Sequence, residues 1–128
     1  MPLKRKYKLL LVEDNPDVRD LTKELLELED YEVYCAANGQ EALDFLKKDP
    51  TLIDLILLDL MMPVMDGYQF RREQLEDPRI VAIPVIVLSA DGDAKSKMEV
   101  LKTQGFYTKA SGIEGLLEVV KRNCELIQ

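Results

Sequence analysis

The chain alternates short apolar runs with longer stretches in which apolar residues recur every three or four positions. Residues 9–12 are apolar throughout, which is typical of a parallel strand buried on both faces. The next stretch has helical spacing at Val18, Leu21, Leu25 and Leu28. The same alternation predicts further strands at residues 31–37, 52–58, 84–88 and 106–109. It predicts further helices from residue 38, over residues 67–75 and 94–103, and from residue 111 to residue 127.

Polar residues at the start of the predicted helices support these boundaries. Asn15 followed by Pro16 provides an N-cap and a first-turn proline. Asp66 can cap the helix that follows it. Ser111 and Glu114 have the spacing of a capping box, in which each side chain accepts a hydrogen bond from the backbone N–H of the other residue.

Five strands that alternate with five helices predict an α/β fold of the doubly wound (βα)5 type. Helices then cover both faces of a five-stranded parallel sheet and form a three-layer sandwich. Right-handed crossovers leave few topologies, and we favour the flavodoxin-like strand order 2-1-3-4-5. A length of 128 residues predicts one domain over residues 1–128, with its core at about residues 8–127 and a basic lead-in at residues 1–7.

The composition limits the classes of function. A net charge of −7 argues against direct binding to nucleic acid, which needs a basic surface. No apolar run approaches the roughly 18 residues of a membrane span, and the apolar stretch after the basic N-terminus is too short for a signal peptide. We therefore expect a cytoplasmic protein without membrane insertion.

Cysteine and histidine exclude several chemistries. Cys35 and Cys124 lie far apart in apolar patterns, which predicts two buried, reduced thiols rather than a metal site. The chain has no histidine, so it contains neither a His-based triad nor a histidine that could itself carry a phosphoryl group.

The residues at the ends of the predicted strands carry the candidate chemistry. In doubly wound sheets the ligand crevice lies beyond the carboxyl ends of the strands, where the strand order reverses. Glu13 and Asp14 follow the first strand, Asp59 the third and Ser89 the fourth, and Lys109 ends the fifth. The first and third strands are neighbours in the predicted order, so three carboxylates should meet there.

This set of side chains predicts a phosphoryl-acceptor site. Clustered carboxylates repel one another unless a cation is present, and Mg²⁺ prefers such hard oxygen ligands. An aspartate carboxylate can attack phosphorus and form an acyl phosphate. An ammonium and a hydroxyl group beside it can stabilise the charge on the phosphoryl oxygens. Asp59 is the predicted acceptor.

Over about residues 8–127 the sequence resembles the receiver domain of the response regulators of bacterial two-component systems. The matching segments are Leu-Leu-Val-Glu-Asp-Asn at residues 10–15, Asn-Gly-Gln-Glu-Ala-Leu at 38–43, Leu-Asp-Leu-Met-Met-Pro-Val-Met-Asp-Gly at 58–67, Ile-Pro-Val-Ile-Val-Leu-Ser-Ala at 83–90, and Lys109. The resemblance implies a signalling protein that catalyses only its own phosphorylation and dephosphorylation.

The resemblance also implies a role for each site residue. Asp59 accepts a phosphoryl group from a histidine kinase or a histidine phosphotransfer protein. Asp14 and Asp59 bind Mg²⁺ directly, Glu13 acts through water, and the Met61 backbone carbonyl is a further ligand. Met61 and Asp91 occupy the positions at which this family tunes the rate of dephosphorylation.

Two further roles concern the transfer of the signal. Ser89 binds one phosphoryl oxygen and Lys109 neutralises another. When phosphate draws Ser89 inward, an aromatic residue, Phe106 or Tyr107, follows it. The face formed by the predicted fourth helix, fifth strand and fifth helix then binds a downstream protein.

The sequence departs from the family pattern on that same face. Ala110 follows Lys109 where the family usually has a proline after a cis peptide bond, and a cis bond without proline costs about 3–4 kcal/mol. The segment between Ser89 and Lys109 is also slightly short, in the fourth helix or in the loop before the fifth strand. The alternative function is therefore a pseudo-receiver that docks without phosphorylation.

Other classes fit the residues less well. A haloacid-dehalogenase-type phosphatase needs a second aspartate two residues after the nucleophile, and Met61 is at that position. No glycine-rich nucleotide-binding motif occurs. The last predicted helix takes up the residues after Lys109, so we expect either a stand-alone receiver or an excised domain of a larger regulator or hybrid kinase.

Overall fold

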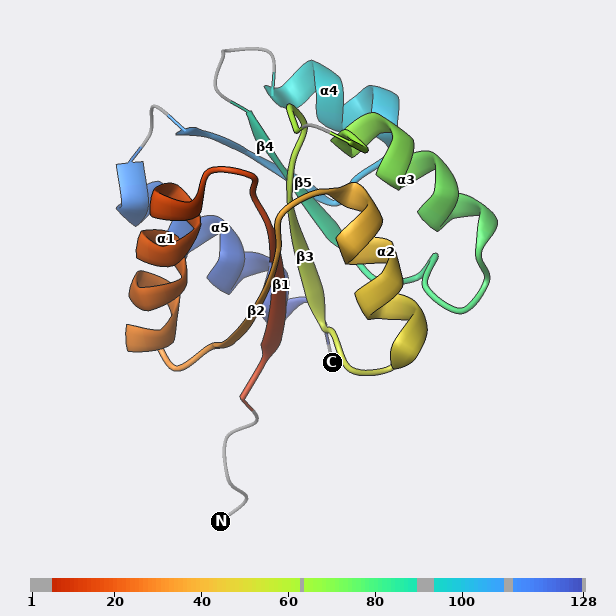
Figure 1. The fold of residues 1–128 in the computed structure, drawn as a ribbon. Coiled ribbons are helices and arrows are strands. Elements are labelled where there is room, and N and C mark those ends of the chain that lie inside the picture. Colours follow the sequence, from red (N-terminus) through yellow and green to blue (C-terminus); the bar gives the residue numbers. More distant parts are fainter. Residues whose placement is uncertain (1–5, 63, 90–93, 110–111, 128) are drawn as a thin grey trace.

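The computed structural model describes residues 6–62, 64–89, 94–109 and 112–127. It contains five parallel strands and five helices in strict alternation (Figure 1). The strands are β1 Lys8–Val12, β2 Glu32–Ala36, β3 Leu55–Asp59, β4 Val85–Ser89 and β5 Gly105–Thr108. The helices are α1 Pro16–Leu28, α2 Gly39–Lys48, α3 Gly67–Glu76, α4 Ala94–Leu101 and α5 Gly112–Glu125.

The sheet has the order β2-β1-β3-β4-β5, so the predicted α/β fold class and strand order are confirmed. Helices α1 and α5 cover one face of the sheet, and α2, α3 and α4 lie on the other (Figure 1). The order reverses between β1 and β3, which are hydrogen-bonded neighbours in register from Leu9 with Leu55 to Val12 with Leu58.

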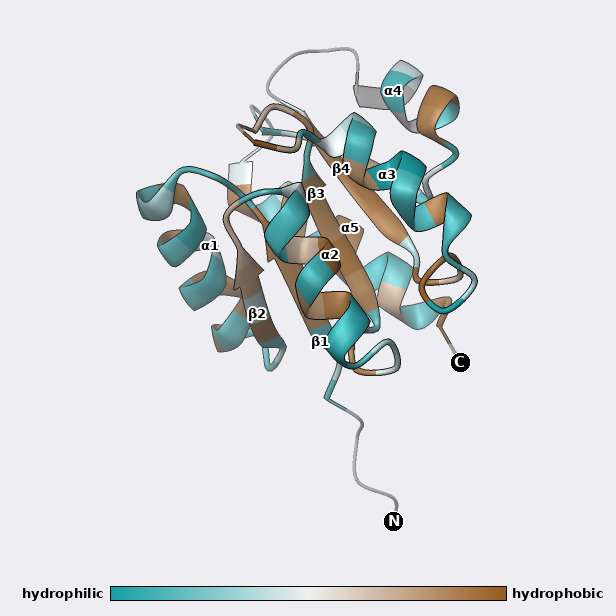
Figure 2. Cartoon of the chain, turned by 45° about the vertical axis from the view of Figure 1, so that its right-hand side comes forward, coloured by the Kyte–Doolittle hydropathy of each residue, from teal (hydrophilic) through white to brown (hydrophobic). Residues whose placement is uncertain are grey.

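Alternation along the strands divides the core into two layers. Successive strand residues point to opposite faces, so Leu10 and Val12 pack toward α2 while Leu9 and Leu11 pack toward α1 and α5. Both layers are fully apolar in the centre of the sheet, which explains why the strands appear in the sequence as unbroken hydrophobic runs. Figure 2 shows hydrophobic strands between helices with mainly hydrophilic outer surfaces.

The predicted N-caps form where the structure describes them. The Asn15 side chain accepts hydrogen bonds from the backbone N–H of Asp17 and of Val18. The Asp66 carboxylate accepts one from Gln69 N at 2.9 Å. The predicted capping box involves Ser111, and the peptide bond before Ala110 and the side chain of Asp91 also lie outside the described residues.

Several boundaries differ from the prediction for local reasons. Strand β3 begins three residues later than expected, and Leu52, where it was expected to begin, lies in a turn in which its N–H donates to Asp49 O. Strand β5 spans Gly105–Thr108 rather than residues 106–109. Helix α4 ends at Leu101, two residues early, because Lys102 has a left-handed backbone with φ 57°.

The two cysteines are free thiols. Cys124 is buried as predicted, but Cys35 is only partly buried, so the prediction of a buried thiol was wrong there. In the part of the chain that the structure describes, no helix has both the length and the apolar character to cross a bilayer.

Candidate functional site

The site lies at the carboxyl ends of β1 and β3, where the strand order reverses. Val12 and Leu58 are register partners, so the residues that follow them, Glu13 and Asp59, lie side by side at the carboxyl ends of the two strands. Carboxylate oxygens of Glu13, Asp14 and Asp59 all lie within 4.8 Å of one another. The three predicted carboxylates therefore form one cluster that could hold a metal ion.

Burial distinguishes the three carboxylates. Glu13 and Asp59 are only 3% and 5% exposed, whereas Asp14 is exposed. Glu13 Oε2 accepts a hydrogen bond from Asn15 N at 3.2 Å, and Asp59 Oδ1 accepts one from Met61 N at 3.2 Å. Backbone N–H groups of the two loops therefore hold the two buried carboxylates in place.

Lys109 contacts the carboxylate cluster from the end of β5. Its Nζ lies 2.9 Å from Glu13 Oε1 and 3.3 Å from Asp59 Oδ2. Partial burial works against the charged form of Lys109, but the hydrogen bond to Glu13 and the charges of Asp59 and Glu13 outweigh it and raise the pKa of the ammonium. Lys109 is therefore a fixed positive charge beside Asp59.

Gly67 allows the loop after β3 to close tightly behind Asp59. A Cβ atom at Gly67 would lie 2.8 Å from the carbonyl oxygen of Asp59 and 2.8 Å from Leu60 Cα. Gly67 N donates to Leu60 O at 3.0 Å, which fixes the start of α3 against the end of β3. The Asp-Gly pair of the sequence thus shapes the backbone of the candidate acceptor.

Ser89 at the end of β4 completes the predicted set. It is 4% exposed and lines a hollow of about 300 Å³. The residues that line this hollow are Glu13, Asp14, Asn15, Val18, Asp59, Met61, Leu88, Ser89, Lys97 and Lys109. All six residues that were predicted to bind the metal or the phosphoryl group therefore meet in one place. For Met61, the prediction concerned the backbone carbonyl and not the side chain.

Lys97 of α4 is in the same hollow and was not predicted. Its Nζ lies 3.4 Å from Ser89 Oγ. The sequence shows two lysines, Lys95 and Lys97, on the helix that follows Ser89, but it does not show which of them reaches the site. Because that helix is short and weakly amphipathic, its rotation about its axis could not be read from the sequence.

The two candidate aromatic residues lie on opposite sides of β5. Tyr107 belongs to the core layer under α5, and its hydroxyl group donates a hydrogen bond to the backbone carbonyl of Gly112. Burial also raises the pKa of Tyr107. Phe106, which is the register partner of Val87, is 37% exposed.

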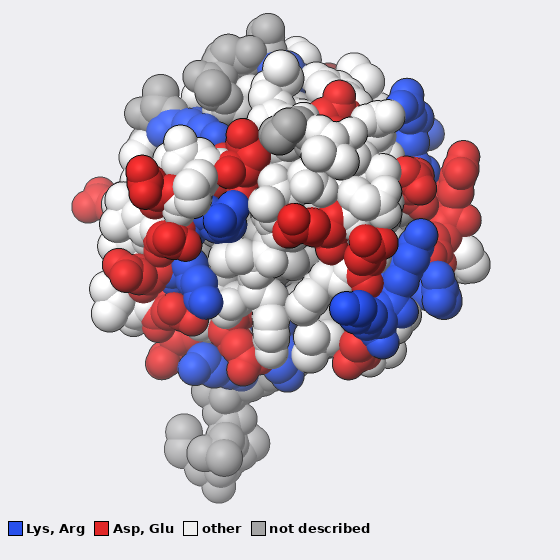
Figure 3. Space-filling view, in the orientation of Figure 1, with Lys and Arg blue, Asp and Glu red and all other residues white. Residues whose placement is uncertain are grey.

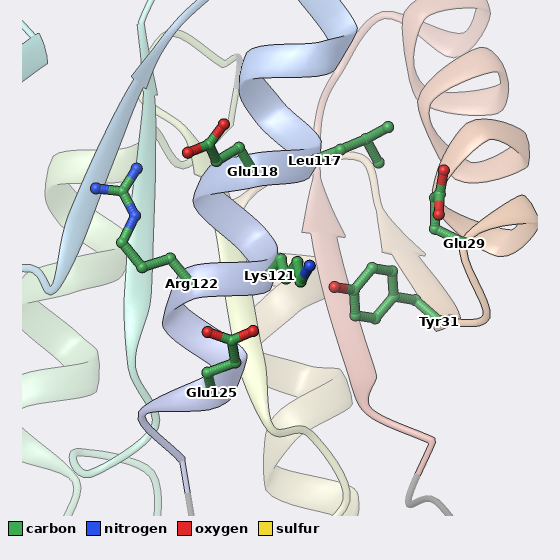
Figure 4. A pocket seen from close by; sticks show the side chains of 7 residues that line it. All are labelled: Glu29, Tyr31, Leu117, Glu118, Lys121, Arg122 and Glu125. Atoms are coloured by element: carbon green, nitrogen blue, oxygen red, sulfur yellow. The ribbon is translucent and has the colours of Figure 1, made fainter.

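A second hollow lies at the opposite edge of the sheet, between the end of α1 and α5. It measures about 700 Å³ and is lined by Glu29, Tyr31, Leu117, Glu118, Lys121, Arg122 and Glu125 (Figure 4). Tyr31 precedes β2 and points toward α5, so this hollow is at the amino ends of the strands. It is the larger of the two, but it contains none of the strand-end residues.

Comparison with known proteins identifies a family whose members carry such a phosphoryl-acceptor site. A family model described as the response regulator receiver domain matches residues 9–121. The chain belongs to this family. Receiver domains are signalling modules that receive phosphoryl groups on an aspartate from histidine kinases in two-component systems.

Individual relatives show how the domain is used elsewhere. The chain is 41% identical to the response regulator Rre1 of Synechocystis over 116 residues, which are 88% of this chain and 49% of that protein. It is 40% identical to the sensor histidine kinase TmoS of Ectopseudomonas mendocina over 94 residues, which are 73% of this chain but 9% of that protein. The chain thus spans half or less of these relatives.

A solved structure supports the fold independently. The response regulator TrrA of Thermotoga maritima, in complex with Mg²⁺ and BeF, superposes with a TM-score of 0.78 at 30% identity. The alignment covers 91% of this chain and 98% of TrrA.

Proposed function

We propose that Asp59 of this receiver accepts a phosphoryl group from the phosphohistidine of a histidine kinase or a histidine phosphotransfer protein. The supporting observation is the position of Lys109, whose ammonium lies 3.3 Å from Asp59 and 2.9 Å from Glu13, the two buried members of the carboxylate cluster. An ammonium in this place neutralises charge on the transferring group, and catalysis of phosphoryl transfer depends on such electrostatic stabilisation together with positioning.

The transfer is a displacement at phosphorus. An Asp59 oxygen forms the new O–P bond while the P–N bond of the donor breaks, and the electron pair of that bond leaves with the imidazole nitrogen. Lys109 binds one phosphoryl oxygen and the Ser89 hydroxyl donates to another. Attack by water later releases inorganic phosphate and restores the Asp59 carboxylate. These two reactions on itself are the only ones we assign to the chain.

Mg²⁺ fits the donor set of the site. We assign Asp14 and Asp59 as direct ligands, Glu13 as a ligand through water and the Met61 backbone carbonyl as a further ligand. Three carboxylates within 4.8 Å of one another favour a hard divalent cation. Bound there, Mg²⁺ supplies charge neutralisation for the carboxylates and for the phosphoryl oxygens. The Mg²⁺ and BeF complex of TrrA supports this assignment.

We assign Phe106 as the aromatic residue that responds to Ser89. Tyr107 is part of the core layer and its hydroxyl group is bonded to Gly112, so its movement would disrupt packing. Phe106 is partly exposed and can change position at the surface. Its movement would alter the face formed by α4, β5 and α5, where we expect a downstream protein to bind.

This face can be tested by amide NMR spectroscopy with acetyl phosphate and Mg²⁺. We expect chemical-shift changes in residues 94–109 and 112–115 upon phosphorylation, and we expect Phe106→Ala to remove those of β5. Unchanged shifts across these residues in a fully phosphorylated sample would contradict the proposed switch.

We further propose that residues 8–127 act as one receiver domain in the cytoplasm and bind proteins rather than nucleic acid or membrane. On the face shown in Figure 3, Lys and Arg are interspersed with Asp and Glu and do not form one continuous basic surface. The net charge of −7 also opposes binding to a phosphate backbone.

Intact-mass spectrometry after incubation with acetyl phosphate tests the acceptor. We expect a gain of one phosphoryl group that requires Mg²⁺, disappears with EDTA and is absent in Asp59→Asn. The matched control is Asp20→Asn, which removes the same charge from an exposed position on α1 and should be labelled like the wild type. No adduct on the wild type would favour a docking module that works without phosphorylation.

A further inference from the structure

Helix α4 sends a lysine side chain into the phosphoryl-acceptor site. Lys97 Nζ lies 3.4 Å from Ser89 Oγ, and Lys97 lines the same hollow as Asp59 and Lys109. The family resemblance assigns a role to Ser89 and to Lys109, but it assigns no role to Lys97. Two lysines therefore line the hollow: Lys109, which follows β5, and Lys97 of α4.

The far end of α4 is attached to a different element. Arg71 of α3 is 3% exposed and donates from Nε to Leu101 O at 2.9 Å. Its Nη2 donates to Lys102 O at 2.5 Å. Carbonyl groups at a helix C-terminus carry partial negative charge, so a buried guanidinium suits them. Arg71 thus holds the last turn of α4, whereas Lys97 extends from the middle of the helix to the site.

We propose that Lys97 is a second cationic ligand of the phosphoryl group on Asp59, and that α4 senses phosphorylation directly through it. The inference rests on the proposed function of Asp59. A phosphoryl group brings about −1.5 to −2 charges at neutral pH and three strong acceptor oxygens. The oxygen of the Ser89 hydroxyl is a weaker acceptor for an ammonium than a charged phosphoryl oxygen.

The geometry gives this ligand a mechanical consequence. Ser89 binds the phosphoryl group through its own hydroxyl, and Lys97 exchanges its 3.4 Å contact with Ser89 for a phosphoryl oxygen. The lysine side chain is long and flexible enough to reorient within the hollow. Because Arg71 fixes the last turn of α4, the pull on Lys97 acts on the rest of the helix. The signal then reaches α4 by a route that does not need the Phe106 side chain.

Titration with beryllium fluoride and Mg²⁺, followed by amide NMR spectroscopy, tests the ligand. Beryllium fluoride mimics a phosphoryl group and needs no covalent donor. We expect Lys97→Gln to bind it roughly tenfold more weakly, as for the loss of one charge-assisted hydrogen bond. The Lys97→Arg variant should restore most of the affinity, since a guanidinium donates to the same oxygens. The wild-type shift changes of α4 should shrink in Lys97→Gln even at saturation.

Lys102→Gln is the matched control because it removes the same charge at the exposed residue that follows the same helix. It should keep wild-type affinity. Equal weakening by Lys97→Gln and Lys102→Gln would overturn the proposal, since it would assign the effect to net charge. Wild-type affinity and wild-type α4 shifts in Lys97→Gln would overturn it as well.

The same samples separate this proposal from the proposed function. Mass spectrometry with acetyl phosphate reports whether Asp59 is phosphorylated in the wild type and in Lys97→Gln. If the wild type gains no phosphoryl group, the assignment of Asp59 fails. If both proteins are phosphorylated and bind beryllium fluoride equally well, Asp59 stands and only the role of Lys97 is lost.

Discussion

Arg71 of α3 donates a hydrogen bond from Nε to the backbone carbonyl of Leu101, 2.9 Å away, and so fastens α3 to the last turn of α4. The guanidinium also donates to Gln74 Oε1 at 2.7 Å. Burial lowers the pKa of Arg71 from its ordinary value. The partners that the structure shows for Arg71 are neutral oxygens, so the network depends on complete hydrogen bonding rather than on an ion pair.

Arg71→Met keeps the apolar length of the side chain but removes the donors. We expect it to lower the free energy of unfolding by about 2 kcal/mol, because Leu101 O and Gln74 Oε1 lose a partner in a buried place. Urea unfolding followed by circular dichroism measures the change. Arg72→Met on the exposed side of α3 is the control and should stay within about 0.5 kcal/mol of the wild type. Equal midpoints for the two variants would contradict the role of Arg71.

The strand-end residues could be predicted because they follow from a simple rule. Unbroken apolar runs mark buried strands, and the carboxyl ends of parallel strands share one edge of the sheet. Asp59 and Ser89 are the last residues of β3 and β4, and Glu13 and Lys109 directly follow β1 and β5. The spatial cluster therefore followed from the order of strands alone.

Lys97 and Arg71 could not be found in the same way. Both lie on helices, where the direction of a side chain depends on how the helix is rotated against the sheet. The inward residues of α3 are Gly67, Phe70, Arg71 and Gln74. Two of these four are polar, so hydrophobic periodicity cannot identify the buried face. Tertiary contacts explain these polar residues: Arg71 donates to carbonyls at the end of α4, and Gln74 donates to Ile80 O and Ile83 O.

Val64, in the loop between β3 and α3, has a left-handed backbone with φ 67° and a side chain that is 81% exposed. A β-branched residue is strained in this region, and little packing is lost with its side chain. We expect Val64→Asn to raise the free energy of unfolding by about 1 kcal/mol, since asparagine tolerates this conformation. Val100→Asn removes a valine of similar exposure, 75%, from helix α4 and should give no gain. Similar effects of the two substitutions in urea unfolding would rule out backbone strain as the cause.

Tyr31 makes stability depend on pH in the alkaline range. Burial, then the nearby Cys124, Glu29 and Glu125, raise the pKa of Tyr31 from 10.0 to about 12. Between these two values the folded protein holds a proton that the unfolded chain has released, so the free energy of unfolding falls as pH rises. In Tyr31→Phe this contribution is absent.

The measurement is urea unfolding of the wild type and of Tyr31→Phe from pH 8 to pH 12. We expect a shallower decline above about pH 10 in the variant and parallel behaviour below it. Lys109, whose pKa is also raised, adds to the decline in both proteins and therefore does not affect the comparison. Parallel curves up to pH 12 would show that the surroundings of Tyr31 do not favour its protonated form.

Asp59 is expected to cost stability when no cation is bound. Glu13, Asp14 and Asp59 bring three negative charges within 4.8 Å, and the ammonium of Lys109 balances one of them. Asp59→Asn should therefore raise the free energy of unfolding in EDTA by about 1 kcal/mol, because it removes repulsion within the carboxylate cluster. Asp20→Asn on α1 is the control and should have little effect.

Addition of Mg²⁺ should make the wild type more stable than Asp59→Asn, which reverses their order in EDTA. An ion that binds only the folded state stabilises it in proportion to the logarithm of its concentration above the Kd. The midpoint of thermal unfolding should rise more for the wild type, with all three carboxylates, than for Asp59→Asn. The Mg²⁺ concentration is varied over roughly two decades, from about 0.1 to about 10 mM, which suits a site of weak affinity. Lys109→Met should also gain more than Asp59→Asn, because it keeps the three carboxylates. Equal gains in all these proteins would mean that the cation binds elsewhere, and the carboxylate cluster would then need a different counter-charge.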